Sequence, residues 1–184
     1  MAELTSTSRL VLGLLRLEGE QTGYELKALA DDSTEFFWAA SYGRIYPELR
    51  RLEEAGLLQR RDEPRGDRPR KLYSLTPAGE QALDEWLTSG GELTFELRDE
   101  GLLRFFLADT LPPEGVRANL RAMRARHDRI AARLRELEPF LREIDHEHCV
   151  LTLQFGIELH TLYTQWCSAM EERLPGSDDE LGGG

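Results

Sequence analysis

The fold of this chain can be read outward from the segment GRIYPELRRLEEAGLLQRR at residues 43–61. Ile45, Leu49 and Leu52 recur at the spacing that places side chains on one face of a helix. Gly56 follows them and is a residue typical of helix C-caps. The five residues after it have the character of a short strand. The segment therefore predicts an amphipathic helix that leads directly into a β-strand.

The segments on either side complete an order of elements. A second strand-like run at residues 71–75 follows residues 64–69, which are expected to form a basic hairpin tip. Thr76 and the proline after it predict the start of a further helix. Upstream, residues 10–17 have helical spacing, and Thr22 begins a Thr-x-x-Glu capping box for a second helix. This order predicts a mainly α fold with a small β-hairpin wing, a winged helix-turn-helix.

Two features stand out within this order. The aromatic residues 36–38 lie between the second and third helices, and we expect them to fill the small core. Pro47 falls within the third helix, where an interior proline costs about 3 kcal/mol. That cost falls if the helix begins near Gly43, because the first amides of a helix have no partner. Ser41 or Gly43 would then cap the helix, and the sequence leaves this choice open.

The outward face of the third helix has the residue types that contact DNA. Tyr42, Tyr46 and Arg50 form an i, i+4, i+8 line, with Arg44 and Arg51 nearby. A major groove about 12 Å wide admits a helix, and arginine can pair with a guanine edge or hold a phosphate. The alternative is a solvated amphipathic helix with ordinary pairs, such as Arg50 with the glutamate four residues later.

The charge of the chain is unevenly distributed. Its net charge is −11, which taken alone argues against a nucleic-acid partner. Residues 44–71, however, hold nine Arg and Lys against six acidic residues, a local charge of +3. Residues 88–184 hold 11 basic and 18 acidic residues, a local charge of −7. A polyanion responds to the field within a Debye length of about 8 Å, so the overall acidity does not exclude DNA.

The motifs of the first half resemble the PadR family of transcriptional regulators. The matching segments are LGLL (12–15), TGYEL (22–26), GRIYPELRRLE (43–53), EAGL (54–57), YSLTPAG (73–79) and WL (86–87). They occur in family order and spacing. FFLAD at residues 105–109 and the later helices are similar to the longer-tailed, Vir-like members.

The resemblance implies a dimeric winged-helix protein, usually a repressor, whose third helix enters the major groove while its wing meets the backbone. It also implies that Tyr46 faces DNA and that Arg68, Arg70 and Lys71 belong to the wing. Proline in the third helix is common in the family. The predicted DNA-binding residues are Tyr24, Ser41, Tyr42, Arg44, Tyr46, Arg50, Arg51, Arg65, Arg68, Arg70 and Lys71.

The second half has the pattern of long paired helices. Spacings of four and three alternate through Val116, Leu120, Met123, His127, Ile130, Leu134, Leu137, Leu141 and Ile144. A second helix near residues 149–172 repeats this rhythm, and Pro139 is expected to kink or interrupt the first. A small winged domain leaves most of this apolar surface uncovered, which favours a homodimer. The predicted dimerisation residues are Leu120, Met123, Ile130, Leu134, Phe155, Leu159, Leu162 and Trp166.

Polar residues in this half invite other interpretations. His127 lies in the apolar seam, where a residue that sets register is favoured over a pH-sensitive switch. Residues 145–149 contain two His and one Cys, but consecutive residues on a helix diverge, so a helix junction is favoured over a metal site. Cys149 and Cys167 would lie about 27 Å apart on one helix, too far for a disulfide. We find no catalytic motif and expect no enzyme, no metal and no cofactor.

The sequence also predicts the organisation and location of the chain. We expect a DNA-binding domain at residues 1–88, a helical dimerisation domain at 92–174 and a disordered tail at 175–184. No apolar run approaches the roughly 20 residues of a membrane span, and the first residues lack the pattern of a signal peptide. The two cysteines suggest a reducing compartment. A cytoplasmic location without a membrane partner follows.

The function predicted from these features is a homodimeric, sequence-specific DNA-binding regulator, a repressor by family habit. Two-fold symmetry would hold two recognition helices about 34 Å apart, so the expected partner is double-stranded DNA with a pseudo-palindromic operator. The alternative is a small-molecule sensor or dimeric adaptor that keeps the winged fold but binds DNA weakly. That alternative is motivated by the acidic second half and by Trp86, Phe95, Phe105 and Phe106, and a small aromatic effector would fit it.

Overall fold

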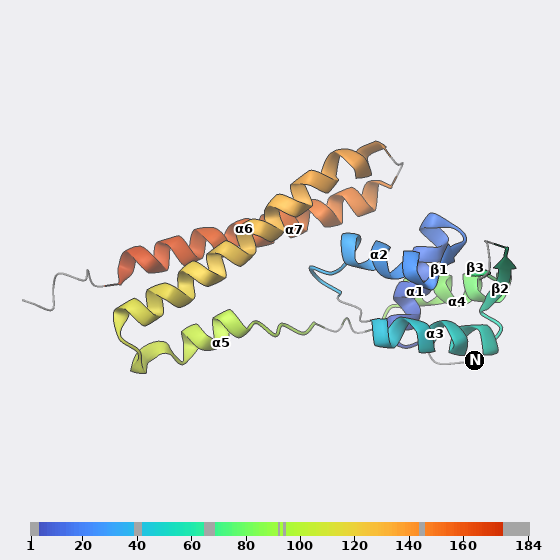
Figure 1. Cartoon of the computed structure of the whole chain (residues 1–184), viewed down its shortest axis with the longest axis horizontal. Helices are drawn as coiled ribbons and strands as arrows, with labels where there is room; N and C mark the ends of the chain where they lie inside the picture. Colours follow the sequence, from blue (N-terminus) through green and yellow to red (C-terminus); the bar gives the residue numbers. More distant parts are fainter. Residues whose placement is uncertain are drawn as a thin grey trace, which may run out of the picture. The chain divides into compact units, whose positions relative to one another are not determined.

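The computed structural model describes residues 4–38, 42–64, 69–91, 93, 95–143 and 146–174. The chain forms two compact units, residues 1–93 and 94–184, and both are drawn in Figure 1. The first unit comprises α1 (Ser6–Glu18), β1 (Gln21–Thr22), α2 (Gly23–Ser33), α3 (Tyr42–Glu54), β2 (Leu58–Glu63), β3 (Arg70–Leu75) and α4 (Pro77–Leu87). This is the predicted winged helix-turn-helix order, with β1 as an addition.

Local sequence signals explain where three of these helices begin. The Thr5 hydroxyl accepts a hydrogen bond from the Ser8 amide at 3.0 Å and caps α1. The capping box predicted at Thr22 is confirmed, because the Glu25 amide donates to the Thr22 hydroxyl at 3.2 Å and the Thr22 amide donates back to the Glu25 carboxylate at 2.9 Å. Thr76 caps α4, whose first residue is Pro77. These caps satisfy amides that have no partner within the helix.

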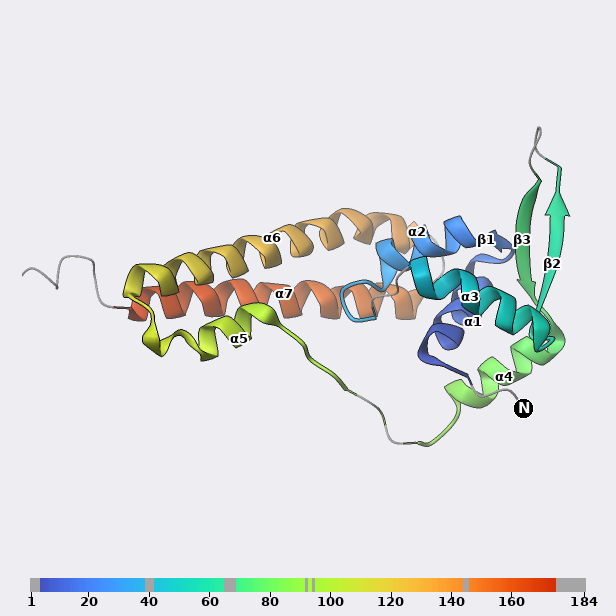
Figure 2. The ribbon, with the colours of Figure 1, turned by 60° about the horizontal axis from the view of Figure 1, so that its bottom comes forward.

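The three strands form an antiparallel sheet in the order β1-β3-β2. In the hairpin, Leu58 pairs with Leu75 and Glu63 pairs with Arg70. β1 joins the other edge of β3, where Gln21 pairs with Tyr73. Figure 2 shows β2 and β3 extending side by side from the helices. The predicted wing is therefore confirmed as a two-stranded hairpin, anchored at its base by a short third strand.

The hydrophobic core of this unit is formed by side chains of α1, α2 and α3, with further residues from β2, β3 and α4. It contains Val11, Leu12, Leu14, Leu15, Leu26, Ala30, Ile45, Leu49, Leu52, Leu58, Tyr73 and Leu83. The expectation that residues 36–38 fill this core is wrong. Phe37 is 49% exposed, and Phe36 and Trp38 are half-buried at the edge of the unit. The aliphatic side chains of α1, α2 and α3 fill the centre, so these aromatic rings remain at its rim.

α3 runs without a break through Pro47. The helix begins at Tyr42, so Pro47 is its sixth residue and lies beyond the first four amides, which lack helical partners in any helix. The expected relief of strain by a later start is therefore not observed. The N-cap position, Ser41, lies outside the described residues.

The second unit is helical throughout its described part. It comprises α5 (Glu100–Phe106), the 3-10 turn η1 (Ala108–Thr110), α6 (Pro113–Glu143) and α7 (Glu147–Arg173). α6 and α7 pack side by side as a long antiparallel hairpin, with α5 against one end of it (Figure 2). α6 continues through Pro139 to Glu143, so the predicted interruption at this proline is not observed. The expected tail, residues 175–184, lies outside the described residues.

Candidate nucleic-acid interface

α3 has one face in the core and one in solvent. Ile45, Leu49 and Leu52 are at most 1% exposed. Arg44 and Arg50 are exposed, and neither has an ion pair or side-chain hydrogen bond within the part of the chain that the structure describes. Two guanidinium groups thus lie on the solvent face of α3, and none of the described carboxylates pairs with them. Such groups are available to a phosphate or a guanine edge.

Arg51 differs from these two arginines, because its guanidinium is used inside the unit. It donates to both carboxylate oxygens of Glu48, at 2.7 and 3.1 Å, and to the Ser8 hydroxyl at 2.6 Å. The hydrogen bond that Arg51 donates to the Glu48 carboxylate raises the pKa of Arg51 above its ordinary value. A DNA contact from Arg51 would require breaking these bonds, so the role of Arg51 in the structure is internal.

Tyr46 lies on the half-exposed edge of α3, against the start of α2. It is 45% exposed. A Cβ atom added to Gly23 would lie 2.7 Å from Tyr46 Cε1 and 3.1 Å from Leu49 Cδ1, so only glycine allows this approach. Tyr24, the next residue, is 66% exposed. The first turn of α2 and the middle of α3 therefore present two tyrosines that keep access to solvent.

The wing contains both paired and unpaired cations. Arg70 forms ion pairs with Glu25 and, at 3.5 Å, with Glu63. Hydrogen bonds from Thr22 and Arg70, the backbone amide of Thr22 first among them, hold the pKa of Glu25 below its ordinary value. Lys71 is exposed and has no ion pair with any described residue. Of the predicted wing contacts, Lys71 is available and Arg70 is engaged.

The remaining predicted contacts cannot be placed. Ser41, Arg65 and Arg68 lie outside the described residues, as does the side chain of Tyr42. The structure thus brings Arg44, Tyr46 and Arg50 together on one helix. It adds Glu48, which is not among the predicted contacts. Its signal was available: a glutamate occupies an i, i+3 position of the apolar face that begins at Ile45.

Comparison with known proteins identifies this unit. Residues 11–85 match the model of the transcriptional regulator PadR-like family, and residues 97–175 match the virulence activator alpha C-term family. This segment is similar to PadR-like transcriptional regulators. The resemblance drawn from the sequence motifs is confirmed, including the Vir-like second half.

Individual relatives agree with this assignment. The negative transcriptional regulator PadR of Bacillus subtilis (strain 168) is 33% identical over 102 residues, which cover 55% of this chain and 56% of that protein. The match thus spans little more than half the length of this curated relative. The PadR-like fold extends further than the sequence match, as the solved structures show.

Two solved structures cover nearly the whole chain. The crystal structure of B. subtilis PadR in complex with operator DNA has a TM-score of 0.82 at 22% identity, covering 94% of this chain and 100% of that one. The structure of B. subtilis PadR in complex with p-coumaric acid has a TM-score of 0.71 at 23% identity, covering 92% and 98%. At these identities the similarity establishes a shared fold.

The predicted dimerisation residues fall into two groups. Leu120, Met123 and Leu134 are buried within the protomer, between α6 and its own neighbours, and Ile130 is half-buried. On α7, Phe155 is 59% and Leu162 is 61% exposed, whereas Leu159 and Trp166 are half-buried. The seam of α6 is thus covered by the same chain, and the corresponding stripe of α7 faces outward.

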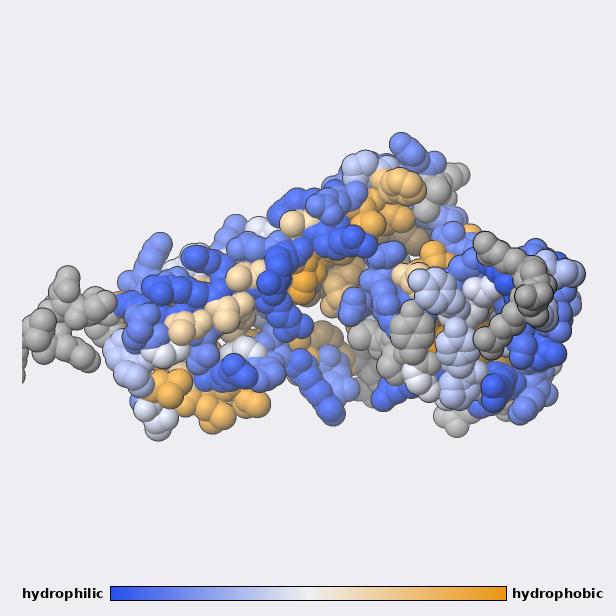
Figure 3. Space-filling model, viewed as in Figure 1, coloured by the Kyte–Doolittle hydropathy of each residue, from blue (hydrophilic) through white to orange (hydrophobic). Residues whose placement is uncertain are grey.

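A second exposed apolar patch lies on α5. Leu103, Phe106 and Leu107 are 57%, 79% and 61% exposed. Figure 3 shows hydrophobic side chains gathered over this helix at the lower left. Phe95, one of the aromatic residues that motivated a sensor role, is 89% exposed, while Phe105 packs edge-on against Trp166 with ring centroids 5.0 Å apart.

The helical unit also buries a polar cluster. The Nδ1 atoms of His127 and His160 lie 2.7 Å apart, and the His127 ring stacks on Tyr163 with centroids 4.0 Å apart. The Asp99 carboxylate lies 3.8 Å from His127 Nε2. Within the described residues, no three His, Cys, Asp or Glu side chains are arranged to hold a metal ion. Helical spacing in the sequence points to His127 alone, because Asp99, His160 and Tyr163 come from other parts of the chain.

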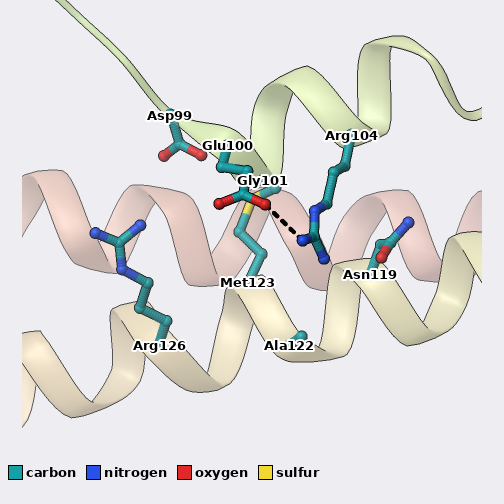
Figure 4. Close-up of a pocket in the computed structure, with 8 residues that line it drawn as sticks. All are labelled: Asp99, Glu100, Gly101, Arg104, Asn119, Ala122, Met123 and Arg126. Atoms are coloured by element: carbon teal, nitrogen blue, oxygen red, sulfur yellow. Dashed lines mark hydrogen bonds and ion pairs between the residues drawn. The ribbon is translucent and has the colours of Figure 1, made fainter.

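A pocket of about 200 Å³ opens between α5 and α6. Figure 4 shows Arg104 of α5 and Asn119 and Arg126 of α6 around it, with Arg104 paired to Glu100. Met123 forms part of its wall and would lie 2.8 Å from a Cβ atom added to Gly101. None of the helices in the described ranges combines the length and apolar character needed to cross a bilayer.

Proposed function

We propose that this protein is a homodimeric, sequence-specific DNA-binding transcriptional regulator that acts as a repressor. The observation that carries the proposal is α3, which buries one face completely and presents Arg44, Tyr46 and Arg50 on the other. A helix anchored in this way suits the major groove. The relative described as a negative regulator and the PadR structure with operator DNA support the same function.

The exposed residues divide into two roles. Arg50 and Lys71 are assigned to phosphate contacts, which supply affinity without reading sequence. Arg44 and Tyr46 are assigned to base edges, since arginine can bond a guanine in two places. Tyr24, Ser41, Tyr42, Arg65 and Arg68 remain proposed contacts. Arg51 and Arg70 are proposed to act mainly through their ion pairs with Glu48 and Glu25, which orient α3 and the wing.

A homodimer would double the recognition surface. The exposed stripe on α7 offers apolar area for a second copy, with Phe155 and Leu162 at its centre. Two α3 helices related by two-fold symmetry would read half-sites one helical turn apart, so the operator should be a pseudo-palindrome. We place this function in the cytoplasm and propose no catalytic activity for it.

Fluorescence anisotropy tests the proposal. The purified protein is titrated onto a duplex from the region upstream of its own gene and onto a scrambled duplex, at several salt concentrations. We expect tight binding to the upstream duplex alone, with the logarithm of affinity falling steeply with the logarithm of salt. Equal weak binding to both duplexes, with and without a candidate effector, would contradict sequence-specific recognition.

A second function, small-molecule sensing, is favoured by the pocket between α5 and α6. Two carboxylates, Asp99 and Glu100, line it together with Arg104 and Arg126, and Arg126 has no ion pair with a described residue, so its guanidinium is the group that could bind the carboxylate of an organic acid. The PadR structure with p-coumaric acid shows that a relative of this fold holds an aromatic acid. Trp166 lies in the same unit, so a p-coumaric acid titration followed by tryptophan fluorescence tests this role. A response that Arg126→Ala does not weaken would exclude this pocket.

A further inference from the structure

We infer that Glu48 is the positioning residue that fixes the orientation of α3 and thereby the operator preference. The inference rests on the proposed function. It concerns a side chain that cannot contact DNA itself, because Glu48 is only 8% exposed on the inner face of the helix. Its effect must therefore pass through the residues on the opposite face.

The Glu48 carboxylate joins α3 to the first turn of α1. It accepts a hydrogen bond from the Thr5 hydroxyl at 3.0 Å and another from the Ser8 hydroxyl. The same two residues form the cap of α1, where the Thr5 amide donates to the Ser8 hydroxyl at 2.8 Å. Arg51 closes the network by donating to both Glu48 and Ser8. One carboxylate thus receives hydrogen bonds from Arg51 of its own helix and from Thr5 and Ser8 at the start of α1, 43 and 40 residues away in sequence.

This network is charged under ordinary conditions. Burial alone would raise the pKa of Glu48, but hydrogen bonds from Arg51, Ser8 and Thr5 outweigh it and hold the pKa below its ordinary value. The hydrogen bonds that the two Glu48 oxygens accept are directional, in contrast to the aliphatic contacts of Ile45 and Leu49, which tolerate rotation and sliding. Glu48 therefore specifies one rotation of α3 among those that the apolar core would allow.

The rotation matters because of what α3 presents. Arg44 lies four positions before Glu48 and Arg50 two positions after it. The Tyr46 ring packs against Gly23 of α2. Base-edge hydrogen bonds depend on displacements below an ångström, whereas phosphate attraction does not. Loss of the carboxylate should thus reduce discrimination between sequences and leave general DNA affinity largely intact.

The test compares Glu48→Gln with Glu54→Gln. Both variants remove one negative charge from α3, but Glu54 is exposed and has no ion pair with a described residue. The ratio of dissociation constants for scrambled and operator duplexes is measured by anisotropy, beside a thermal melt that establishes the folded fraction. We expect Glu48→Gln to lower this ratio by about tenfold or more, with Glu54→Gln within about twofold of the wild type. Ser8→Ala, which weakens the network from α1, should lower the ratio to a lesser degree.

Hydrogen exchange provides a readout that does not depend on DNA. Glu48→Gln should speed amide exchange across residues 42–54 and leave residues 77–87 unchanged. If the wild type does not prefer its operator, the proposed function fails, and the exchange data alone decide whether Glu48 positions α3. If Glu48→Gln does not fold, Ser8→Ala replaces it in both the duplex-binding and the hydrogen-exchange measurements. An unchanged duplex ratio together with unchanged exchange across 42–54 would overturn the inference.

Discussion

The Nδ1 atoms of His127 and His160 lie 2.7 Å apart between α6 and α7, so one imidazole must donate to the other. The pair is 3% and 5% exposed. Burial, together with the nearby charges of His127 and Arg126, lowers the pKa of His160 from 6.5 to about 4. Burial also lowers the pKa of His127, and the attraction of Asp99 only partly offsets it. The folded state thus holds this pair neutral.

The pair predicts acid sensitivity of the helical unit. Above pH 6.5 the pair is neutral in both the folded and unfolded states. As the pH falls from 6.5 towards about 4, His160 is protonated in the unfolded chain but stays neutral in the folded chain. The free energy of unfolding therefore decreases. The decrease from His160 alone is on the order of 3 kcal/mol, and it levels off below its folded pKa. Urea unfolding at a series of pH values, followed by circular dichroism, measures it.

A matched variant separates this effect from general acid denaturation. His160→Gln removes the buried imidazole and should flatten the pH dependence between 6.5 and 4, whatever its effect on stability at neutral pH. His148→Gln removes an exposed imidazole from the same helix and serves as the control. A His160→Gln protein with the wild-type pH dependence would show that carboxylates elsewhere control the transition.

Arg50 and Arg51 are neighbours in sequence for which we predict opposite phenotypes. Arg50→Ala should weaken binding to operator and scrambled DNA alike and reduce the salt slope by about one unit, because one phosphate is no longer neutralised, with little change in melting temperature. Arg51→Ala should lower the melting temperature, because Glu48 and Ser8 lose their shared donor. Arg129→Ala, in the helical unit, controls for the loss of an exposed charge. Equal salt slopes for Arg50→Ala and Arg129→Ala would remove Arg50 from the interface.

Gly23 predicts a steric effect on Tyr46. Gly23→Ala places a methyl group 2.7 Å from Tyr46 Cε1, so the ring must move, and we expect a loss of stability of about 1 kcal/mol and weaker operator binding. Gly13→Ala in α1 meets nothing within 4 Å and should stabilise the protein by about 0.5–1 kcal/mol. Thermal melts measure both variants, and a melting temperature of Gly23→Ala at or above the wild-type value would contradict the close approach.

Much of the fold could be predicted because its signals are local. The caps at Thr22 and Thr76 depend on residues within three positions, so the sequence alone locates the helix starts. β1 could not be predicted, since two residues become a strand only by pairing with Tyr73 and Leu72, some 50 positions away. The position of the aromatic residues 36–38 could not be predicted for a similar reason. Hydrophobicity does not reveal that aliphatic side chains already fill the core.

The same distinction applies to the candidate site and the helical unit. The outward face of α3 follows from helical spacing, but the engagement of Arg51 and Arg70 depends on Ser8 and Glu25, at least 43 residues away. A heptad pattern likewise shows that a helix has an apolar stripe without identifying what covers it. The stripe of α6 proved to be covered by α7 of the same chain.

The outward stripe of α7 yields the last prediction, which concerns self-association. Phe155→Ala removes a ring that is 59% exposed in the protomer, so the folded monomer should lose little stability. Burial of an aromatic side chain contributes about 1.5–3 kcal/mol. If the ring is buried against a second copy, a two-fold interface contains it twice, so the substitution removes this contribution from both copies. The dimer dissociation constant should then rise by about 100-fold or more, as measured by analytical ultracentrifugation. Gln165→Ala, on an exposed polar position of the same helix, should leave it unchanged. A dissociation constant that stays at the wild-type value in Phe155→Ala would place the interface elsewhere and make the exposed patch of Leu103, Phe106 and Leu107 the next surface to substitute.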